Sequence, residues 1–174
     1  MQTCSVLIID DDRILLDTLA SSLRLHYPAV RIETAESALA SLQRIRSMNE
    51  AVVVCDAHQP RMEGIGFLRG VRKLHPDLPV LLLIEKHDAD YIRQAMKAGA
   101  YDVLVKPVDE GLLQLAVHRA LEAARLRGEV KREEEKLLTK VRSLMKDLEV
   151  LYAADGLQSH FDAFMDSVQA ERAK

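Results

Sequence analysis

The sequence lacks the features that mark several classes of protein. It has no tryptophan and only 4% aromatic residues, so platforms for stacking nucleic-acid bases are not expected. The two cysteines, Cys4 and Cys55, are too few for a disulfide framework, and they lie at opposite ends of their predicted strands. Apolar runs such as residues 51–55 and 80–84 are far shorter than the roughly 20 residues of a membrane span. Because no secretion signal is visible either, we expect a cytoplasmic protein with no membrane contact.

The charge is nearly balanced. There are 24 Lys and Arg residues against 27 Asp and Glu residues, a net charge of −3, which argues against direct binding of nucleic acid. Hydrophobic residues make up 48% of the chain and charged residues 29%, which is typical of a globular protein. The length of 174 residues allows one domain with an appendage.

The first part of the chain alternates strand patterns with helical patterns. Three of the five predicted strands are apolar on both faces, as central parallel strands covered by helices are. Short connections between strands and helices imply right-handed crossovers. We therefore predict an α/β fold with a doubly wound, five-stranded parallel sheet. The predicted strands are residues 6–9, 30–34, 51–55, 79–84 and 102–105.

The pattern changes after Pro107, beyond which no proline occurs. A helix is predicted from Asp109 to about Tyr152, which Gly128 could kink or interrupt. We therefore predict two parts, residues 1–127 and residues 128–174. The second part is expected to be a coiled coil, a bundle helix or a linker. Exposed Phe161 and Phe164, on a second short amphipathic segment, are candidates for docking a partner. The apolar positions that form a predicted heptad seam are Val130, Leu137, Val141, Leu144, Leu148 and Leu151.

Charged residues follow three of the predicted strands. Asp10, Asp11 and Asp12 end the first strand, Asp56 ends the third, and Lys106 ends the fifth. In a doubly wound sheet these three strands can lie side by side, and functional groups gather at the carboxyl edge. Asp12 alone is typical of a helix N-cap, but the group as a whole is not explained by capping.

Clustered carboxylates with one lysine point to Mg²⁺-assisted phosphoryl chemistry. Hard oxygen ligands suit Mg²⁺, two carboxylates can hold the ion, and a third can act as the nucleophile. The lysine would neutralise phosphoryl oxygens. A mononucleotide site would instead have glycine, serine and threonine after the first strand, so a flavodoxin-like FMN binder is disfavoured.

Three segments together resemble the response-regulator receiver domain of two-component systems. They are VLIIDDD at 6–12, DAHQPRMEG at 56–64 and AGAYDVLVKP at 98–107, and they occur in the expected order. The resemblance covers residues 1 to about 127 and implies the CheY-like strand order 2-1-3-4-5. It also implies a signalling phosphoacceptor, not an enzyme beyond self-phosphorylation and self-dephosphorylation.

The resemblance assigns roles to individual residues. Asp56 would accept a phosphoryl group from a sensor histidine kinase or phosphotransfer protein, and Lys106 would contact that group. Asp10, Asp11, Asp56 and the backbone carbonyl of His58 would hold Mg²⁺, and the Lys106–Pro107 peptide bond would be cis. His58 and Lys86 correspond to the positions that tune phosphoryl lifetime, although both also suit solvated loops.

Two positions depart from the family pattern. Ile84 stands where the family usually has serine or threonine, and Val103 stands where it usually has an aromatic residue. An isoleucine cannot hydrogen-bond a phosphoryl oxygen. The usual switch is therefore absent, while phosphoryl acceptance does not depend on it.

Several functions remain open at this stage. The favoured one is a phosphorylated receiver that relays its signal through protein contacts and forms a homodimer through the C-terminal helix. The second is a phosphorylation-independent pseudo-receiver, motivated by Ile84 and Val103. Another is a receiver-plus-linker fragment of a larger regulator. The last is an aspartate-dependent phosphohydrolase, because Asp10-x-Asp12 resembles the start of such an enzyme's motif, but the later acidic pair and the cap that such an enzyme needs are not visible in the sequence.

Overall fold

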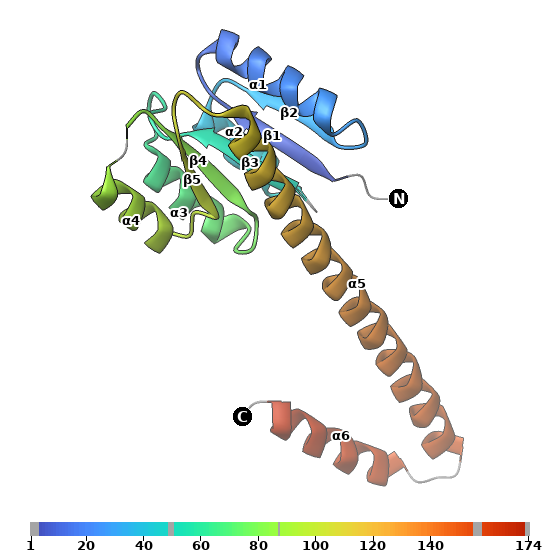
Figure 1. Ribbon diagram of the computed structural model, residues 1–174. Helices are drawn as coiled ribbons and strands as arrows, with labels where there is room; N and C mark the ends of the chain where they lie inside the picture. The colour runs from blue at the N-terminus through green and yellow to red at the C-terminus, as the bar shows by residue number, and fades with distance from the viewer. Residues whose placement is uncertain (1–3, 49–50, 87, 155–157, 173–174) are drawn as a thin grey trace. The chain divides into compact units, whose positions relative to one another are not determined.

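The computed structural model describes residues 4–48, 51–86, 88–154 and 158–172, and its centre is a parallel β-sheet with helices on both faces (Figure 1). The strand order is β2-β1-β3-β4-β5, which confirms the predicted doubly wound topology. The strands are β1 (Ser5–Ile9), β2 (Arg31–Ala35), β3 (Ala51–Asp56), β4 (Val80–Ile84) and β5 (Asp102–Val105). The helices are α1 (Arg13–His26), α2 (Ala38–Ile45), α3 (Gly64–Leu74), α4 (Ala89–Lys97), α5 (Glu110–Ala154) and α6 (Gln158–Arg172).

The three apolar strand patterns form the middle of the sheet. Every residue of β3 and β4 is buried, as are the last four residues of β1. At the edge, β2 pairs only with β1 among the described residues and carries the exposed Arg31, which forms an ion pair with Glu33 at 2.8 Å. The parallel register sets Ile9 opposite Cys55, so the residues that follow β1 and β3 emerge next to each other.

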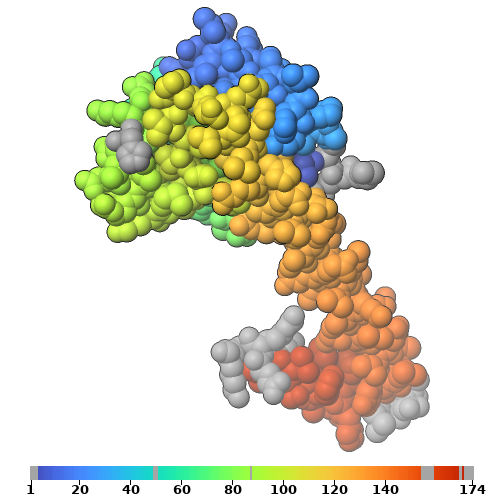
Figure 2. Space-filling view, viewed as in Figure 1, coloured from blue at the N-terminus to red at the C-terminus, as the bar shows by residue number. Residues whose placement is uncertain are grey.

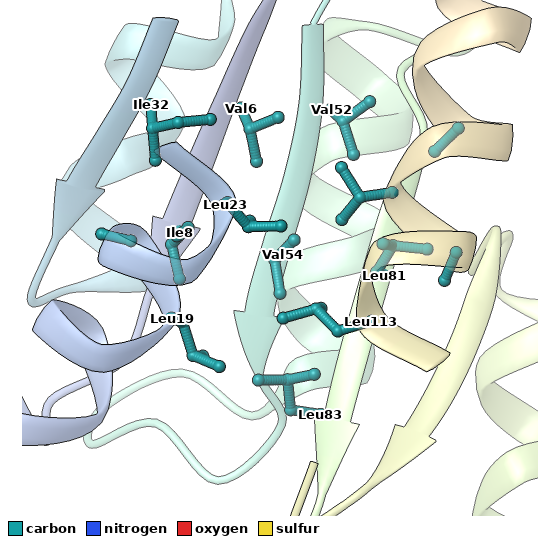
Figure 3. Close-up of a cluster of buried hydrophobic side chains, with 14 of the residues drawn as sticks. Val6, Ile8, Leu19, Leu23, Ile32, Val52, Val54, Leu81, Leu83 and Leu113 are labelled. Atoms are coloured by element: carbon teal, nitrogen blue, oxygen red, sulfur yellow. The ribbon is translucent and has the colours of Figure 1, made fainter. Parts of the chain in front are cut away.

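Each face of the sheet has its own apolar layer. Side chains of α1 and the first part of α5 cover one face, where Leu19, Leu23 and Leu113 meet Val54 and Leu83 (Figure 3). The other face is covered by α2, α3 and α4, with Phe67 fully buried. A buried side chain of this size stabilises the fold by about 1.5–3 kcal/mol, so these layers hold the carboxyl edge of the sheet in place.

Helices α1 and α5 lie next to each other on the first of these two faces (Figures 1 and 2). The hydroxyl of Tyr27 donates a hydrogen bond to the carbonyl of Gln114 at 2.7 Å, and Ser22 donates one to the Glu110 carboxylate. These contacts fix the start of α5 within the first unit.

The chain divides into two units, residues 1–128 and 129–174. The predicted boundary lay one residue earlier, but α5 continues through Gly128, so the expected interruption there was wrong. A helix interior tolerates one glycine at a cost of about 1 kcal/mol. None of the helices in the described part of the chain has the length and hydropathy of a membrane span.

The second unit contains the rest of α5 and α6. Phe161 is buried, with its ring 5.8 Å from that of Tyr152, so its prediction as an exposed docking residue was wrong. Phe164 is exposed. The sequence also predicts a break at Asp155–Gly156, which lies outside the described residues. The predicted seam is exposed at every position, from 40% at Leu148 to 68% at Val130.

Candidate functional site

Three carboxylates gather where β1 and β3 end. Asp10, Asp11 and Asp56 each place a carboxylate oxygen within 4.8 Å of the others. Asp10 and Asp56 are only 1% and 4% exposed, whereas Asp11 is exposed to solvent. Buried carboxylates repel one another unless a cation lies between them, so this cluster requires a positive partner.

Lys106 supplies one positive charge. Its Nζ lies 2.8 Å from Oδ1 of Asp56 and donates a hydrogen bond to Oδ2 of Asp10 at 3.0 Å. The expectation that the first, third and fifth strands lie side by side was wrong, because β4 separates β3 from β5. The long side chain of Lys106 nevertheless reaches both carboxylates. The backbone N–H of Lys106 donates a hydrogen bond to the carbonyl of Ile84, at the end of β4. The Lys106–Pro107 bond is cis.

The charge of Lys106 is stabilised by these carboxylates. Burial alone would lower the pKa of Lys106, but the hydrogen bonds and negative charges of Asp56 and Asp10 outweigh burial and leave the pKa raised. The lysine is therefore a fixed cation beside Asp56 over the working pH range.

The segments after β1 and β3 orient the carboxylates through the backbone. Asp10 accepts a hydrogen bond from the N–H of Asp12 at 2.9 Å, and Asp56 accepts one from the N–H of His58 at 3.2 Å. Asp12 caps α1 by accepting from the N–H groups of Ile14 and Leu15, which confirms its predicted capping role. The three consecutive aspartates thus have different structural environments.

Gln59 is a site residue that the sequence did not predict. It is 6% exposed, its amide donates to Asp11 Oδ1 at 3.4 Å, and its carbonyl oxygen accepts from the N–H of Ala38 at 3.3 Å. The side chain therefore ties Asp11 to the start of α2. In the sequence, only its position three residues after Asp56 pointed to a role at the site. Its burial depends on contacts between distant segments, which the sequence pattern does not show.

The donor set suits Mg²⁺. Asp10, Asp11 and Asp56 offer hard carboxylate oxygens, and the exposure of Asp11 leaves room for water ligands, which Mg²⁺ usually keeps. Thiol chemistry is not favoured at this site. Burial, together with the negative charges of Asp56 and Asp10, raises the pKa of the neighbouring Cys55 thiol, so the soft thiolate form is suppressed.

The two atypical switch positions are apolar in the structure as well. Ile84 ends β4 and is 2% exposed, and Val103 is a half-buried residue of β5. No hydroxyl stands at either position. His58 and Lys86, the predicted lifetime-tuning residues, are both exposed to solvent.

A second unpredicted residue, Tyr91 of α4, lies against the segment that follows Asp56. Its ring stacks on that of His58, with centroids 6.3 Å apart and an interplanar angle of 19°. Burial raises the pKa of Tyr91 to about 12, and the negative charges of Glu63 and Asp56 add to this effect. Nothing in the sequence placed Tyr91 near His58.

Comparison with protein families matches residues 6–118 to the response regulator receiver domain. Similar curated proteins include the transcriptional regulatory protein ZraR of Klebsiella oxytoca, 33% identical over 121 residues, which are 70% of this chain and 27% of that protein. Another is the response regulator protein FleR of Pseudomonas aeruginosa, 37% identical over 118 residues, which are 67% of this chain and 24% of that protein. The chain thus spans about a quarter of the length of these relatives.

Solved structures of similar fold are covered almost completely by this chain. The crystal structure of FixJ-N is 30% identical with a TM-score of 0.62, and the match covers 70% of this chain and 96% of that one. The solution structure of the beryllofluoride-activated NtrC4 receiver domain dimer is 25% identical with a TM-score of 0.62, covering 68% of this chain and 96% of that one.

Proposed function

Because the chain belongs to the response regulator receiver family, we propose that Asp56 accepts a phosphoryl group from a phosphohistidine of a sensor kinase or phosphotransfer protein. The observation that carries the proposal is the ion pair of Lys106 with Asp56 and its hydrogen bond to Asp10, in a site that holds a third carboxylate. Family membership gives the signalling class, and the geometry supports Asp56 as the acceptor.

In the transfer step, a carboxylate oxygen of Asp56 attacks phosphorus. A P–O bond forms as the P–N bond breaks, and the departing imidazole nitrogen keeps the electron pair and takes a proton. Lys106 lies where it can contact the incoming phosphoryl oxygens while still facing Asp10. The protein acts as an acceptor, with catalysis limited to its own phosphorylation and dephosphorylation.

Asp10, Asp11 and Asp56 would hold Mg²⁺, together with the carbonyl of His58 that the family resemblance implies. When bound, the ion offsets the negative charge that accumulates on the phosphoryl oxygens. The residues of this chain orient the carboxylates: the N–H groups of Asp12 and His58 and the amide of Gln59 each hold one.

The acceptor role is tested by incubating the full chain with Mg²⁺ and acetyl phosphate and then measuring the intact mass. We expect wild type to gain one phosphoryl group, Asp56→Ala to gain none, and the control Asp17→Ala, at an exposed position of α1, to behave as wild type. If wild type gains no Asp56-dependent adduct, the acceptor role is refuted. The pseudo-receiver, favoured by the apolar residues Ile84 and Val103, would then be the better description.

We further propose that the receiver relays its state through a homodimer formed along α5. The support is the row of six exposed apolar side chains on this helix, whose heptad spacing is typical of a coiled-coil seam. A similar receiver, that of NtrC4, is a dimer when activated by beryllofluoride.

Two valine variants separate a seam from general surface hydrophobicity. Val141 lies on the seam and Val150 lies off it, and they are 50% and 63% exposed. We expect Val141→Glu to abolish the dimer in light scattering and Val150→Glu to leave it intact. A Val141→Glu chain that remains dimeric would contradict a seam-mediated dimer, as would a dimer that survives removal of the chain after Arg127.

A further inference from the structure

Tyr91 brings α4 into contact with the segment that follows the acceptor aspartate. Helix α4 begins at Ala89, and Asp88 caps it by accepting hydrogen bonds from the N–H groups of Asp90 and Tyr91. The cap fixes the first turn of α4 and therefore the direction of Tyr91. From there the tyrosine ring stacks on the imidazole of His58.

The hydroxyl of Tyr91 does not explain this placement. It is buried without a hydrogen-bond partner among the described residues. The backbone N–H of Ile65 is near enough to lower the pKa of Tyr91, but its position relative to the Tyr91 hydroxyl is not that of a hydrogen bond. A buried hydroxyl without a partner costs about 1–3 kcal/mol, so the ring contacts must hold the side chain in place.

Room for Tyr91 comes from a glycine. A Cβ at Gly64, the first residue of α3, would lie 2.9 Å from the tyrosine oxygen and 2.9 Å from the Cα of Ala57. Any larger residue there would displace either the ring or the segment that carries His58. The β3–α3 segment and α4 therefore meet at one closely fitted point.

His58 connects this point to the site. Its N–H donates a hydrogen bond to Oδ2 of Asp56 at 3.2 Å, while the residue is exposed to solvent. An exposed imidazole would be free to rotate away into solvent. Stacking on Tyr91 removes this freedom and holds the imidazole at the solvent side of the segment next to Asp56.

We propose that Tyr91 is a positioning residue for His58, and that the stacked imidazole limits the access of water to the phosphoryl group on Asp56. The pair thereby lengthens the lifetime of the aspartyl phosphate. This inference rests on the proposed acceptor function. It assigns the positioning task to the tyrosine ring and gives no task to its hydroxyl.

The test measures phosphoryl lifetime in the full chain. Each variant is loaded with acetyl phosphate and Mg²⁺, desalted, and followed by intact mass. Loss of one aromatic contact predicts an about twofold to tenfold shorter lifetime for Tyr91→Leu. We expect His58→Ala to shorten the lifetime at least as much, and Tyr91→Phe to match wild type. The control Tyr27→Leu, which removes a ring elsewhere in the same unit, should leave the lifetime unchanged.

The decisive comparison is the double variant His58→Ala/Tyr91→Leu. If Tyr91 acts through His58, the double variant has the lifetime of His58→Ala alone. A purely structural role for Tyr91 would shorten the lifetime further, and that result would overturn the inference. So would an unchanged lifetime in His58→Ala, or a loss in Tyr91→Phe equal to that in Tyr91→Leu.

A second measurement separates this inference from the acceptor function. The ring-proton shifts of His58 in NMR report the stack without any phosphoryl group. These chemical shifts should change in Tyr91→Leu and stay near the wild-type values in Tyr91→Phe. Unchanged His58 shifts in Tyr91→Leu would contradict the stacking contact itself. If the shifts behave as expected but wild type takes no phosphoryl group, the acceptor function fails and the lifetime role fails with it. If wild type is phosphorylated and the double variant is additive, only the role of Tyr91 fails.

Discussion

Replacing Lys106 with methionine tests whether the site is held together by charge. Methionine keeps most of the side-chain volume but removes the cation that faces Asp56 at 2.8 Å and Asp10 at 3.0 Å. At an effective dielectric constant near 20, each such ion pair corresponds to about 6 kcal/mol of Coulomb energy. Most of this is offset by the cost of burying the charges.

The net loss follows from burial. The two carboxylates are almost completely buried, while the lysine side chain retains 20% exposure. Removing one partner from a buried pair costs about 3–5 kcal/mol, and the partial exposure reduces this to about 2–4 kcal/mol. In a chain of this size we expect the midpoint of thermal unfolding in EDTA to fall by about 6–12 °C.

Magnesium gives a second test, because the ion should oppose the loss of stability that the substitution causes. The ion should stabilise Lys106→Met more than wild type, because in the variant it relieves a repulsion that the lysine otherwise relieves. Binding at ten times the dissociation constant adds about 1.4 kcal/mol. The control is Arg93→Met, which removes an exposed pair with Asp90 at 2.6 Å and should cost under about 1 kcal/mol. A variant as stable as wild type in EDTA, or one that Mg²⁺ stabilises less than wild type, would refute the electrostatic account.

Three further predictions concern individual positions. Ile84→Thr buries a hydroxyl at a site only 2% exposed, so it should lower the free energy of unfolding by about 1–3 kcal/mol in urea titrations. It should also recover more stability than wild type when beryllofluoride is added, and equal recovery would contradict this. Gly99→Ala places a Cβ 2.6 Å from Nε of Arg72 at φ +98°, so we expect a loss of about 2 kcal/mol or more in the same assay. Tyr91 has a pKa of about 12 in the folded protein against 10.0 for an ordinary tyrosine, so its contribution to stability is complete below pH 10 and disappears as the pH rises through 12. Tyr91→Phe should therefore lose less stability than wild type between pH 10 and 12, and parallel curves would refute the raised pKa.

The sheet could be predicted because its signals are local. Apolar runs such as residues 51–55 read as buried strands, and the acids that end them mark the carboxyl edge whatever their neighbours are. The capping role of Asp12 is likewise a property of a few adjacent residues. Asp10, Asp56 and Lys106 were therefore correctly expected to meet, although the sequence pattern alone misplaced the strand that bears Lys106.

What could not be predicted depends on contacts between distant segments. Gln59 and Tyr91 are ordinary loop and helix residues until the fold brings them to Asp11 and His58. Phe161 was assigned to the surface because its partner, Tyr152, belongs to another helix. A periodic pattern identifies an apolar face, but it does not identify what packs against that face.

The isoleucine at the end of β4 has a consequence for the size of the response. A hydrogen bond to a charged group contributes about 1.5–3 kcal/mol, and 1.4 kcal/mol changes an equilibrium constant tenfold. With Ile84 in place of a hydroxyl, phosphorylation would shift the balance between resting and activated populations about 10- to 150-fold less. If Asp56 is the acceptor, such a receiver would behave as a graded sensor, with a mixture of both populations even when every copy carries a phosphoryl group. A partner that binds one population selectively would then set the output as strongly as the kinase does.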